Sequence, residues 1–334
     1  MKSKALVALV VALSMPGCTS SSGPYAPGDA RASSSASTRA GSWVSPEAAK
    51  SPSLLYVANV GAVNMYAYGN GVAGKLMGQI FDVTDVQGMC TDKTGDVWVT
   101  QGYPHVVTEY AHGSKTPLTI ITRAKGYAVG CAVNPKNGDL AVSYNHPNAK
   151  GGFSYNLVYI YSHADPHDFK EYANSAEVNY GYFLAYDDAG NLYLDGACQY
   201  YDCYPYDLSL LFVLHPGASE FTSVPIDGAQ IRSARGLSWI KPTLLIGAYS
   251  DESGGTSVGY KLLVTKDNAK VVQTIPYTGT GQFWGSTVRA GNVIVPDQTN
   301  DVVRTYSLAN GSLISTLKNK ISSPFSVVIS QAGK

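Results

Sequence analysis

The sequence predicts an all-β protein folded as a single six-bladed antiparallel β-propeller. Three observations predict this fold. The 334 residues are 45% hydrophobic and only 14% charged, with 34 Gly and 24 Tyr, which favours a packed, turn-rich β protein. A short turn-and-strand motif recurs along the chain. The last segment supplies a strand that the first repeat lacks.

The repeat follows a turn residue, Gly or Pro, at positions 52, 95, 138, 190, 242 and 291, with spacings of 43, 43, 52, 52 and 49 residues. Each unit is predicted to contain four strands. Third strands are expected at Val107–Tyr110 and Leu157–Tyr161, and a fourth at Ser312–Leu317. Four strands in a repeat of this length form a propeller blade.

The two ends of the chain complete one another. The first unit begins at its second strand, and Ser326–Ser330 reads as an inner strand. We therefore expect Ser326–Ser330 to pair with Leu54–Ala58 and to complete blade one. Such closure leaves only short, protected sheet edges.

The repeat unit resembles that of the NHL and YncE-like six-bladed propellers. In this unit Gly opens the inner strand, Asp or Asn ends it, and Gly-Asn/Asp precedes an apolar strand. The fullest copy is Gly181–Leu194. The resemblance covers residues 52–334 and implies the fold. It implies no single function, because such propellers include protein-binding modules, ligand binders and lactonase relatives.

The N-terminus reads as an export signal. Lys2 and Lys4 precede the apolar run Ala5–Leu13, and the small Gly17 lies directly before Cys18. This order predicts a signal peptide over residues 1–17 and resembles a lipoprotein box with Cys18 lipidated; a plain signal peptide is the alternative. We expect a membrane-anchored lipoprotein of the cell envelope, facing the periplasm or the outside.

Residues 18–50 are predicted to be a flexible Ser/Ala-rich tether, and residues 51–334 the propeller domain. Few side chains of the tether could form a core. Its length corresponds to an end-to-end distance of about 30 Å. Trp43 and Val44 are its one sizeable apolar pair, which could dock on the domain.

Long connections between second and third strands are expected in three consecutive blades, at Tyr144–Asn156, Gly196–Ser209 and Gly247–Gly259. All three fall on one face, where repeat proteins often bind. Thirteen of the 24 tyrosines lie between residues 144 and 206. A contact surface or simple loop packing would explain the loop tyrosines; the binding candidates are Tyr144, Tyr200, Tyr201, Tyr204 and Tyr206.

Besides Cys18, the chain has four cysteines. Cys198 and Cys203 lie in one loop, and we expect a disulfide between them, with two free thiols as the alternative. Cys90 and Cys131 lie on adjacent inner strands, five and seven residues before their anchors. Both offsets are odd, so the two side chains should point in the same direction around the ring, which argues against a disulfide between them. Both cysteines are therefore expected to be small buried apolar residues.

The mouth of the central channel gives a second set of candidates, Arg123, Arg235 and Trp284. Cations and an aromatic ring around one opening suit an anionic or sugar-like ligand. Salt bridges to carboxylates of neighbouring loops are the alternative explanation.

The evidence for an enzyme is weaker than that for a binding module. A lactonase-like hydrolase would need oxygen ligands around a divalent ion, and Glu177, Asp227 and Asp297 are the candidates. No nucleophile elbow, phosphate-binding loop or haem motif is present. His112, His163 and His215 share one turn position and are expected to be solvated.

The sequence therefore favours a non-catalytic, surface-tethered monomer that binds a protein or glycan of the cell envelope and needs no cofactor. The alternative is the metal-dependent hydrolase. The 24 basic and 24 acidic residues balance, which gives no electrostatic reason to expect a nucleic-acid partner.

Overall fold

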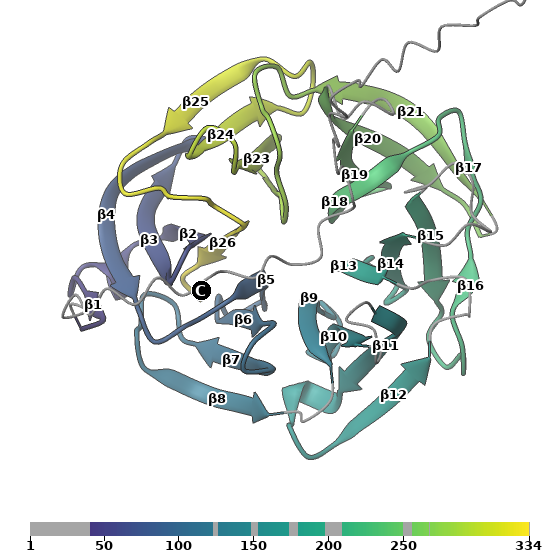
Figure 1. Ribbon diagram of the computed structural model, residues 1–334, viewed down its shortest axis with the longest axis horizontal. Coiled ribbons are helices and arrows are strands. Elements are labelled where there is room, and N and C mark those ends of the chain that lie inside the picture. The colour runs from purple at the N-terminus through teal and green to yellow at the C-terminus, as the bar shows by residue number, and fades with distance from the viewer. Residues whose placement is uncertain are drawn as a thin grey trace, which may run out of the picture. The chain divides into compact units, whose positions relative to one another are not determined.

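Six sheets stand around a common axis (Figure 1), which confirms the predicted six-bladed propeller. The computed structural model describes residues 41–122, 126–147, 153–173, 180–197, 209–249, 256–266 and 268–333. Helix there is limited to two 3-10 turns, η1 (Ala48–Lys50) and η2 (Ser162–Ala164). Among these residues, no helix is long and apolar enough to cross a membrane.

Each blade is given from its inner strand outward. Blade one contains β26 (Ser326–Gln331), β2 (Ser53–Asn59), β3 (Ala62–Gly69), β4 (Val72–Ile80) and β1 (Trp43–Val44). Blade two contains β5 (Val86–Thr91), β6 (Val97–Gln101), β7 (Val106–Tyr110) and β8 (Pro117–Thr122). Blade three contains β9 (Tyr127–Val133), β10 (Leu140–Pro147), β11 (Phe153–Tyr161) and β12 (Phe169–Ala173).

Blade four contains β13 (Tyr180–Tyr186), β14 (Leu192–Ala197), β15 (Ser209–Leu214) and β16 (Thr222–Ser223). Blade five contains β18 (Arg232–Ile240), β19 (Thr243–Tyr249), β20 (Ser257–Val264), β21 (Ala269–Pro276) and the short parallel strand β17 (Ile226–Asp227). Blade six contains β22 (Thr287–Arg289), β23 (Asn292–Asp297), β24 (Val302–Ser307) and β25 (Leu313–Leu317).

The ring closes as predicted, through antiparallel pairing of β26 with β2. Leu54 lies opposite Ser330, and Ala58 lies opposite Ser326. Blade two reinforces the closure, because His112 contacts the Ser330 hydroxyl at 2.6 Å and the Ser51 carbonyl at 2.7 Å. His112 is therefore a structural bridge between two blades and not a solvated turn residue.

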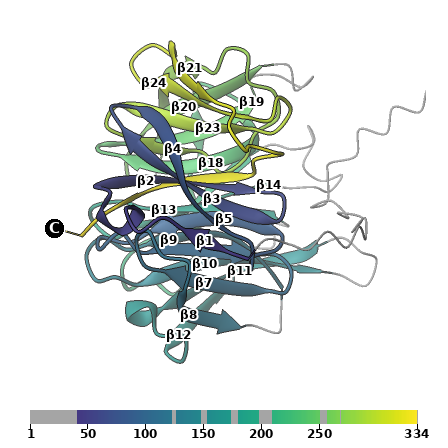
Figure 2. The same cartoon turned by 90° about the vertical axis from the view of Figure 1, so that its left-hand side faces the viewer.

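The inner strand of each blade starts at one end of the ring and finishes at the other (Figure 2). We call the end where the inner strands start the loop face, because the links between blades and the connections between second and third strands meet there. The opposite end carries the tight turns and is called the turn face. Asp187 shows how such a turn is stabilised, since its carboxylate accepts hydrogen bonds from the backbone N–H groups of Ala189 and Asn191, both at 2.8 Å.

Strands occupy part of two connections that were expected to be loops. In blade three β10 runs to Pro147 and β11 starts at Phe153, while in blade five the strands run to Tyr249 and from Ser257. Buried polar residues continue the blade-three hairpin: Asn156 lies opposite Asn145 and donates to its side-chain oxygen at 3.0 Å. Asparagine reads as a turn residue in sequence, but here the side-chain amide of Asn156 donates to Asn145 and to the Tyr144 carbonyl inside the sheet.

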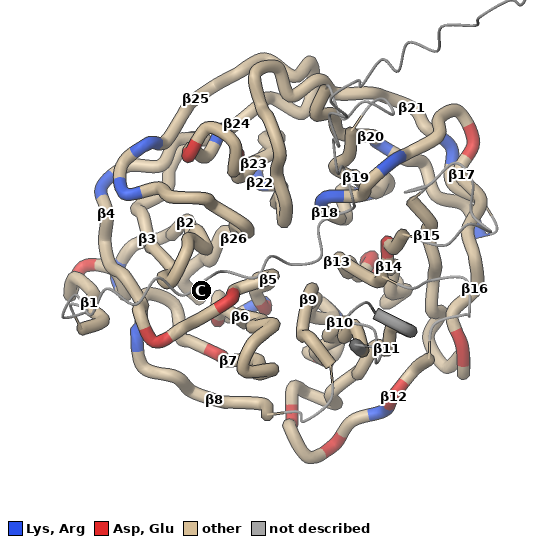
Figure 3. The backbone as a smooth tube through the Cα atoms, viewed as in Figure 1, with Lys and Arg blue, Asp and Glu red and all other residues tan. Residues whose placement is uncertain are grey.

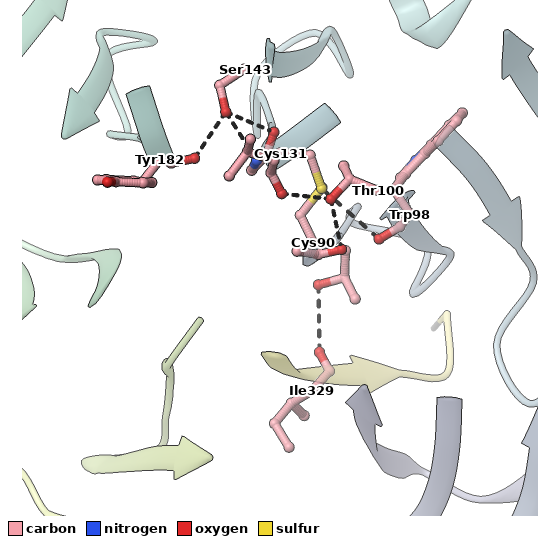
Figure 4. Close-up of a disulfide and its surroundings, with 11 residues drawn as sticks. Cys90, Trp98, Thr100, Cys131, Ser143, Tyr182 and Ile329 are labelled. Carbon is pink, nitrogen blue, oxygen red and sulfur yellow. Dashed lines mark hydrogen bonds between the residues drawn. A yellow bond between two sulfur atoms is a disulfide. The ribbon is translucent and has the colours of Figure 1, made fainter. Parts of the chain in front are cut away.

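Neighbouring blades are joined by hydroxyl groups on their second strands (Figure 4). Thr100 donates to the carbonyl of Val129 at 2.6 Å, and Ser143 donates to that of Tyr182 at 2.9 Å. Four tyrosines of the strands also lie between blades, buried in clusters that join residues of two blades: Tyr159, Tyr161, Tyr186 and Tyr193.

The structure corrects the prediction for Cys90 and Cys131, which form a disulfide between β5 and β9 with a Cα–Cα distance of 5.7 Å (Figure 4). The turn of blade three is one residue longer than that of blade two, since Val133 lies opposite Leu140 whereas Thr91 lies opposite Val97. Because of this extra residue, Cys131 lies on the opposite side of its strand from the side expected by counting back from the turn glycine. The two side chains therefore point toward each other.

Residues 42–51 lie along the outer edge of blade one. Trp43 and Val44 pair with Gln79 and Gly78 of β4, and Ala48 is fully buried. The Ser42 hydroxyl donates to Asp82 at 2.9 Å, at the start of the link to blade two. The docking considered for Trp43 and Val44 is thus observed.

Candidate binding site at the channel mouth

Aromatic side chains from three blades meet at the loop-face end of the channel. The Trp284 ring stacks on Phe325 of blade one, with centroids 5.4 Å apart and an interplanar angle of 15°. It also makes an edge contact with Tyr182 of blade four at 5.7 Å. Blades four and six are not adjacent, so Trp284 spans the channel. Tyr182, Trp284 and Phe325 are each half-buried, which leaves part of this aromatic layer exposed.

Arg235 adds a positive charge to the aromatic layer. Its guanidinium carbon lies 3.7 Å from the centroid of the Trp284 ring and 5.1 Å from that of Tyr249. Both distances are within the range of cation–π attraction. Arg235 belongs to β18, whose basic segments lie beside the centre of the ring in Figure 3. We call Tyr182, Arg235, Trp284 and Phe325 the mouth cluster.

A buried carboxylate lies close to the mouth cluster. Asp195 on β14 is fully buried and accepts a hydrogen bond from the backbone N–H of Phe183 at 2.7 Å, while its other oxygen has no partner among the described residues. Burial raises the pKa of Asp195 to about 7, although the Phe183 N–H and the charge of Arg235 act in the opposite direction. The charge of Arg235 thus favours the ionised form of Asp195, whereas burial favours the protonated form.

Two of the predicted binding residues, Arg235 and Trp284, are therefore brought together. Tyr144 has a different place: it is fully buried, its ring meets Tyr159 edge-on at 5.0 Å, and its hydroxyl contacts that of Tyr161 at 3.3 Å. Tyr144 thus serves the packing of the blades. The other candidates lie outside the described residues: Arg123, Tyr200, Tyr201, Tyr204, Tyr206, Glu177, Cys18, Cys198 and Cys203.

The two described members of the proposed metal set have separate surroundings. Asp227 is exposed on β17, the outer edge of blade five, and accepts from the Asn268 side chain at 2.5 Å. Asp297 is fully buried in blade six, where it accepts from Arg304 Nε at 2.9 Å. Across the described ranges, no group of three or more His, Cys, Asp or Glu side chains is placed to hold a metal ion.

His163 and His215 also serve the turns. The Nδ1 atom of His163 contacts the Asn137 carbonyl at 2.8 Å, and that of His215 contacts the Asn191 side chain at 2.8 Å. Each histidine thus connects the turn after the third strand to the turn before the second strand of its own blade.

Sequence reasoning missed three residues of this site: Tyr182, Phe325 and Asp195. The repeat contains a signal for all three. Asp195 lies five residues after the turn glycine Gly190, at the position of Thr100 and Ser143 in blades two and three. Tyr182 and Phe325 lie at the two blades whose inner strands open without the glycine that the other blades have, as in Gly130 of blade three.

The glycine at that position permits close approach between blades. A Cβ on Gly130 would overlap with the carbonyl oxygen of Tyr182 in the next blade. Each member of the mouth cluster directly precedes this position of its blade, which is Phe183, Gly236, Gly285 or Ser326. The mouth cluster thus comes from one place of the repeat in four blades.

The fold and site define a closed six-bladed propeller with an aromatic and cationic channel mouth. No family model matches the chain, and no curated protein matches it. Its fold is similar to that of a chain in the crystal structure of a nidogen/laminin complex, with a TM-score of 0.67, 13% identity, and coverage of 84% of this chain and 100% of that one. A protein of unknown function from Bacteroides caccae matches with a TM-score of 0.56 and 10% identity over 84% and 99% of the two chains. These similarities show the fold.

Proposed function

We propose that the protein is a non-catalytic binding module that recognises a protein partner through the centre of its loop face. The observation that carries the proposal is the mouth cluster, in which Tyr182, Trp284 and Phe325 from three blades meet at the channel under the charge of Arg235. Trp, Tyr and Arg are the residues that most often dominate the energy of protein interfaces, and they do so near the centre of the interface.

Three further observations support a protein partner. The cluster is half-exposed and held in place by stacking, so little side-chain freedom would be lost on binding. The sequence places its longest connections around the same face. The similar chain in the nidogen/laminin structure belongs to a complex of proteins. A glycan that stacks on the aromatic rings is the competing occupant.

The experiment compares partner capture by two variants. Immobilised protein is incubated with a cell-envelope extract, and Trp284→Ala is expected to lose the captured proteins. The matched control is Trp43→Ala, since Trp43 is 39% exposed on the rim of blade one and lies outside the mouth cluster. Both variants should keep a melting transition within a few degrees of the wild type, which separates loss of binding from loss of fold.

Three outcomes would contradict the proposal. Trp284→Ala could capture the same proteins as the wild type, or Trp43→Ala could lose them equally. A protease-treated extract that still competes fully for the immobilised protein would identify the partner as a glycan.

Arg235→Gln provides a second variant that keeps the aromatic layer; loss of the cation–π contact should weaken capture to a smaller extent.

Surface tethering is part of the same proposal. Lys2, Lys4 and the Gly17-Cys18 pair support export and lipidation at Cys18. Cys18→Ala should release the protein from the membrane fraction into the periplasm or medium. If Cys18→Ala stayed in the membrane fraction, lipidation at Cys18 would be contradicted.

A further inference from the structure

Asp195 occupies a place in blade four where blades two and three have a hydroxyl group. Thr100 and Ser143 each lie five residues after the turn glycine of their blade, as Asp195 does. Ser143 accepts a hydrogen bond from the backbone N–H of Gly130 in its own inner strand at 2.9 Å and donates to a carbonyl of the next blade. A hydroxyl can do both because it has a proton as well as lone pairs.

Asp195 makes the first of these two bonds. Its Oδ1 accepts from the backbone N–H of Phe183 at 2.7 Å, which is the counterpart in blade four of the bond between Gly130 and Ser143. Its Oδ2 is buried and has no hydrogen-bond partner among the described residues. Buried polar atoms without a partner are rare in folded proteins, so the second bond has to be found.

The position in the repeat indicates the group that Oδ2 faces. Thr100 donates to the carbonyl of Val129, and Ser143 donates to that of Tyr182 (Figure 4). Each acceptor lies directly before the same inner-strand position of the next blade, and in blade five that residue is Arg235. A carbonyl oxygen and an ionised carboxylate can only accept hydrogen bonds, whereas a protonated carboxyl donates one. Oδ2 can therefore bond to the Arg235 carbonyl only when it carries a proton.

The boundary between blades four and five suits a carboxyl group better than a hydroxyl. A Cβ on Gly88 or Gly130 would overlap with the acceptor carbonyl of the next blade. Blade four has Phe183 at this position, and its Cβ requires a wider gap to blade five. The side chain of Asp195 is one bond longer than that of Ser or Thr, so it can span the wider gap.

One cation acts on this buried carboxyl. β14 pairs with β13 and β15 and packs against β18. Burial raises the pKa of Asp195 to about 7, and the charge of Arg235 lowers the pKa by less than burial raises it. The titratable and charged side chains on the described parts of these four strands, besides Asp195, are Tyr180, Tyr182, Tyr186, Tyr193, Arg232 and Arg235.

We propose that Asp195 is a positioning residue for the mouth cluster: its protonated carboxyl donates to the Arg235 carbonyl across the blade boundary, and release of that proton to water breaks the bond and draws the guanidinium away from the Trp284 ring. The ionised carboxylate repels the carbonyl and attracts the guanidinium, so both changes act on Arg235. The cation–π contact should thus be complete at acidic pH and weaken as pH rises above neutrality. The consequence for partner capture rests on the proposed function, but the change in the cluster does not.

Fluorine NMR tests the proposal without any partner. The chain contains four tryptophans, which are labelled with 5-fluorotryptophan in the Cys18→Ala protein to avoid lipid, and Trp284→Phe identifies the Trp284 signal. This signal should shift between pH 5.5 and pH 8.5 with a midpoint of about 7, and the Trp43 signal should not follow it. Asp195→Asn keeps an amide donor toward Arg235 at every pH, so its Trp284 signal should stay at the low-pH position.

The matched control is Ser143→Ala, which removes the equivalent bond one blade earlier and should leave the midpoint unchanged. Asp195→Thr places the hydroxyl of blade two at this position and should also abolish the titration, which provides a second variant should Asp195→Asn not fold. A Trp284 signal that does not titrate in the wild type, or a titration that persists in folded Asp195→Asn or Asp195→Thr, would overturn the proposal. Equal loss of the titration in Ser143→Ala would overturn it as well.

Capture from the cell-envelope extract gives a second readout. The wild type should capture at least about threefold more at pH 6 than at pH 8, because the cation–π contact contributes to binding, and Asp195→Asn should capture equally at both. A titrating Trp284 signal without Trp284-dependent capture would contradict the proposed function alone. Capture that depends on Trp284 and not on pH would contradict the role of Asp195.

Discussion

Asp195 is the residue at which burial and charge oppose one another most strongly. Its pKa is raised by burial from 3.8 to about 7, so between these values the folded protein binds a proton that the unfolded chain has released. The free energy of unfolding contributed by this residue is therefore largest below pH 4, and it falls as pH rises toward 7, by up to about 1.4 kcal/mol per pH unit.

Asp195→Asn should remove this pH dependence while keeping an oxygen to accept from the Phe183 N–H. We expect the variant to be about as stable as the wild type at pH 4 and more stable at pH 7.5. Urea unfolding at the two pH values measures the difference. A variant less stable than the wild type at pH 7.5 would show that the Asp195 carboxylate is ionised and stabilised by Arg235.

The Cys90–Cys131 bond links two inner strands across 41 residues of sequence. A cross-link of this span restricts the unfolded chain, so the double variant Cys90→Ala/Cys131→Ala should lose between about 3 and about 5 kcal/mol of unfolding free energy. Denaturant unfolding without reductant measures the loss. The control pair Cys198→Ala/Cys203→Ala keeps this bond and should remain sensitive to reductant, and equal stability of wild type and Cys90→Ala/Cys131→Ala would contradict the role of the bond.

At the scale of the element, the turn of blade two supports the closing strand. Gly95 has a φ of +92°, and a Cβ there would overlap with the carbonyl of Gln331 at the end of β26. Gly138 holds the equivalent place in blade three with a φ of +79° and no atom near its Cβ position. A side chain is disfavoured at both positions because φ is positive, but only Gly95 contacts the closing strand β26.

Gly95→Ala should therefore destabilise the protein more than Gly138→Ala, by at least about 1 kcal/mol beyond the shared backbone strain. It should also increase hydrogen exchange in β26 and β2, while Gly138→Ala should leave exchange in those strands unchanged. Equal effects of the two substitutions on stability and on exchange would mean that this turn does not hold β26 in place.

The strands of this protein were predictable where the repeat is regular, and less so where it changes by one residue. The pairing of Ser326–Ser330 with Leu54–Ala58 follows from the repeat and is observed. The Cys90–Cys131 bond could not be read from anchor spacing, because one extra residue in the turn of blade three reverses which side Cys131 faces. A side-chain period of two makes register sensitive to any single insertion.

At the scale of the whole molecule, the sequence predicts the number of blades and the face of the long connections. It does not show which residues of different blades touch one another at the channel. Arg235 and Trp284 were separate candidates in blades five and six, and the structure places the guanidinium of Arg235 over the ring of Trp284. Phe325 joins them only because closure brings the chain end beside blade six. Tyr144 shows the reverse case, since a tyrosine in an expected loop continues a strand and becomes core.

The central claim is that a protein partner contacts the loop face at the mouth cluster, and site-specific photo-crosslinking in intact cells tests it most directly. A benzophenone amino acid placed at the half-buried Tyr182 should give a discrete protein adduct, which Trp284→Ala in the same chain removes. The same probe at Leu118, which is 57% exposed on the outer strand of blade two, should give none. Adducts of equal yield at both positions, or at neither, would contradict the claim.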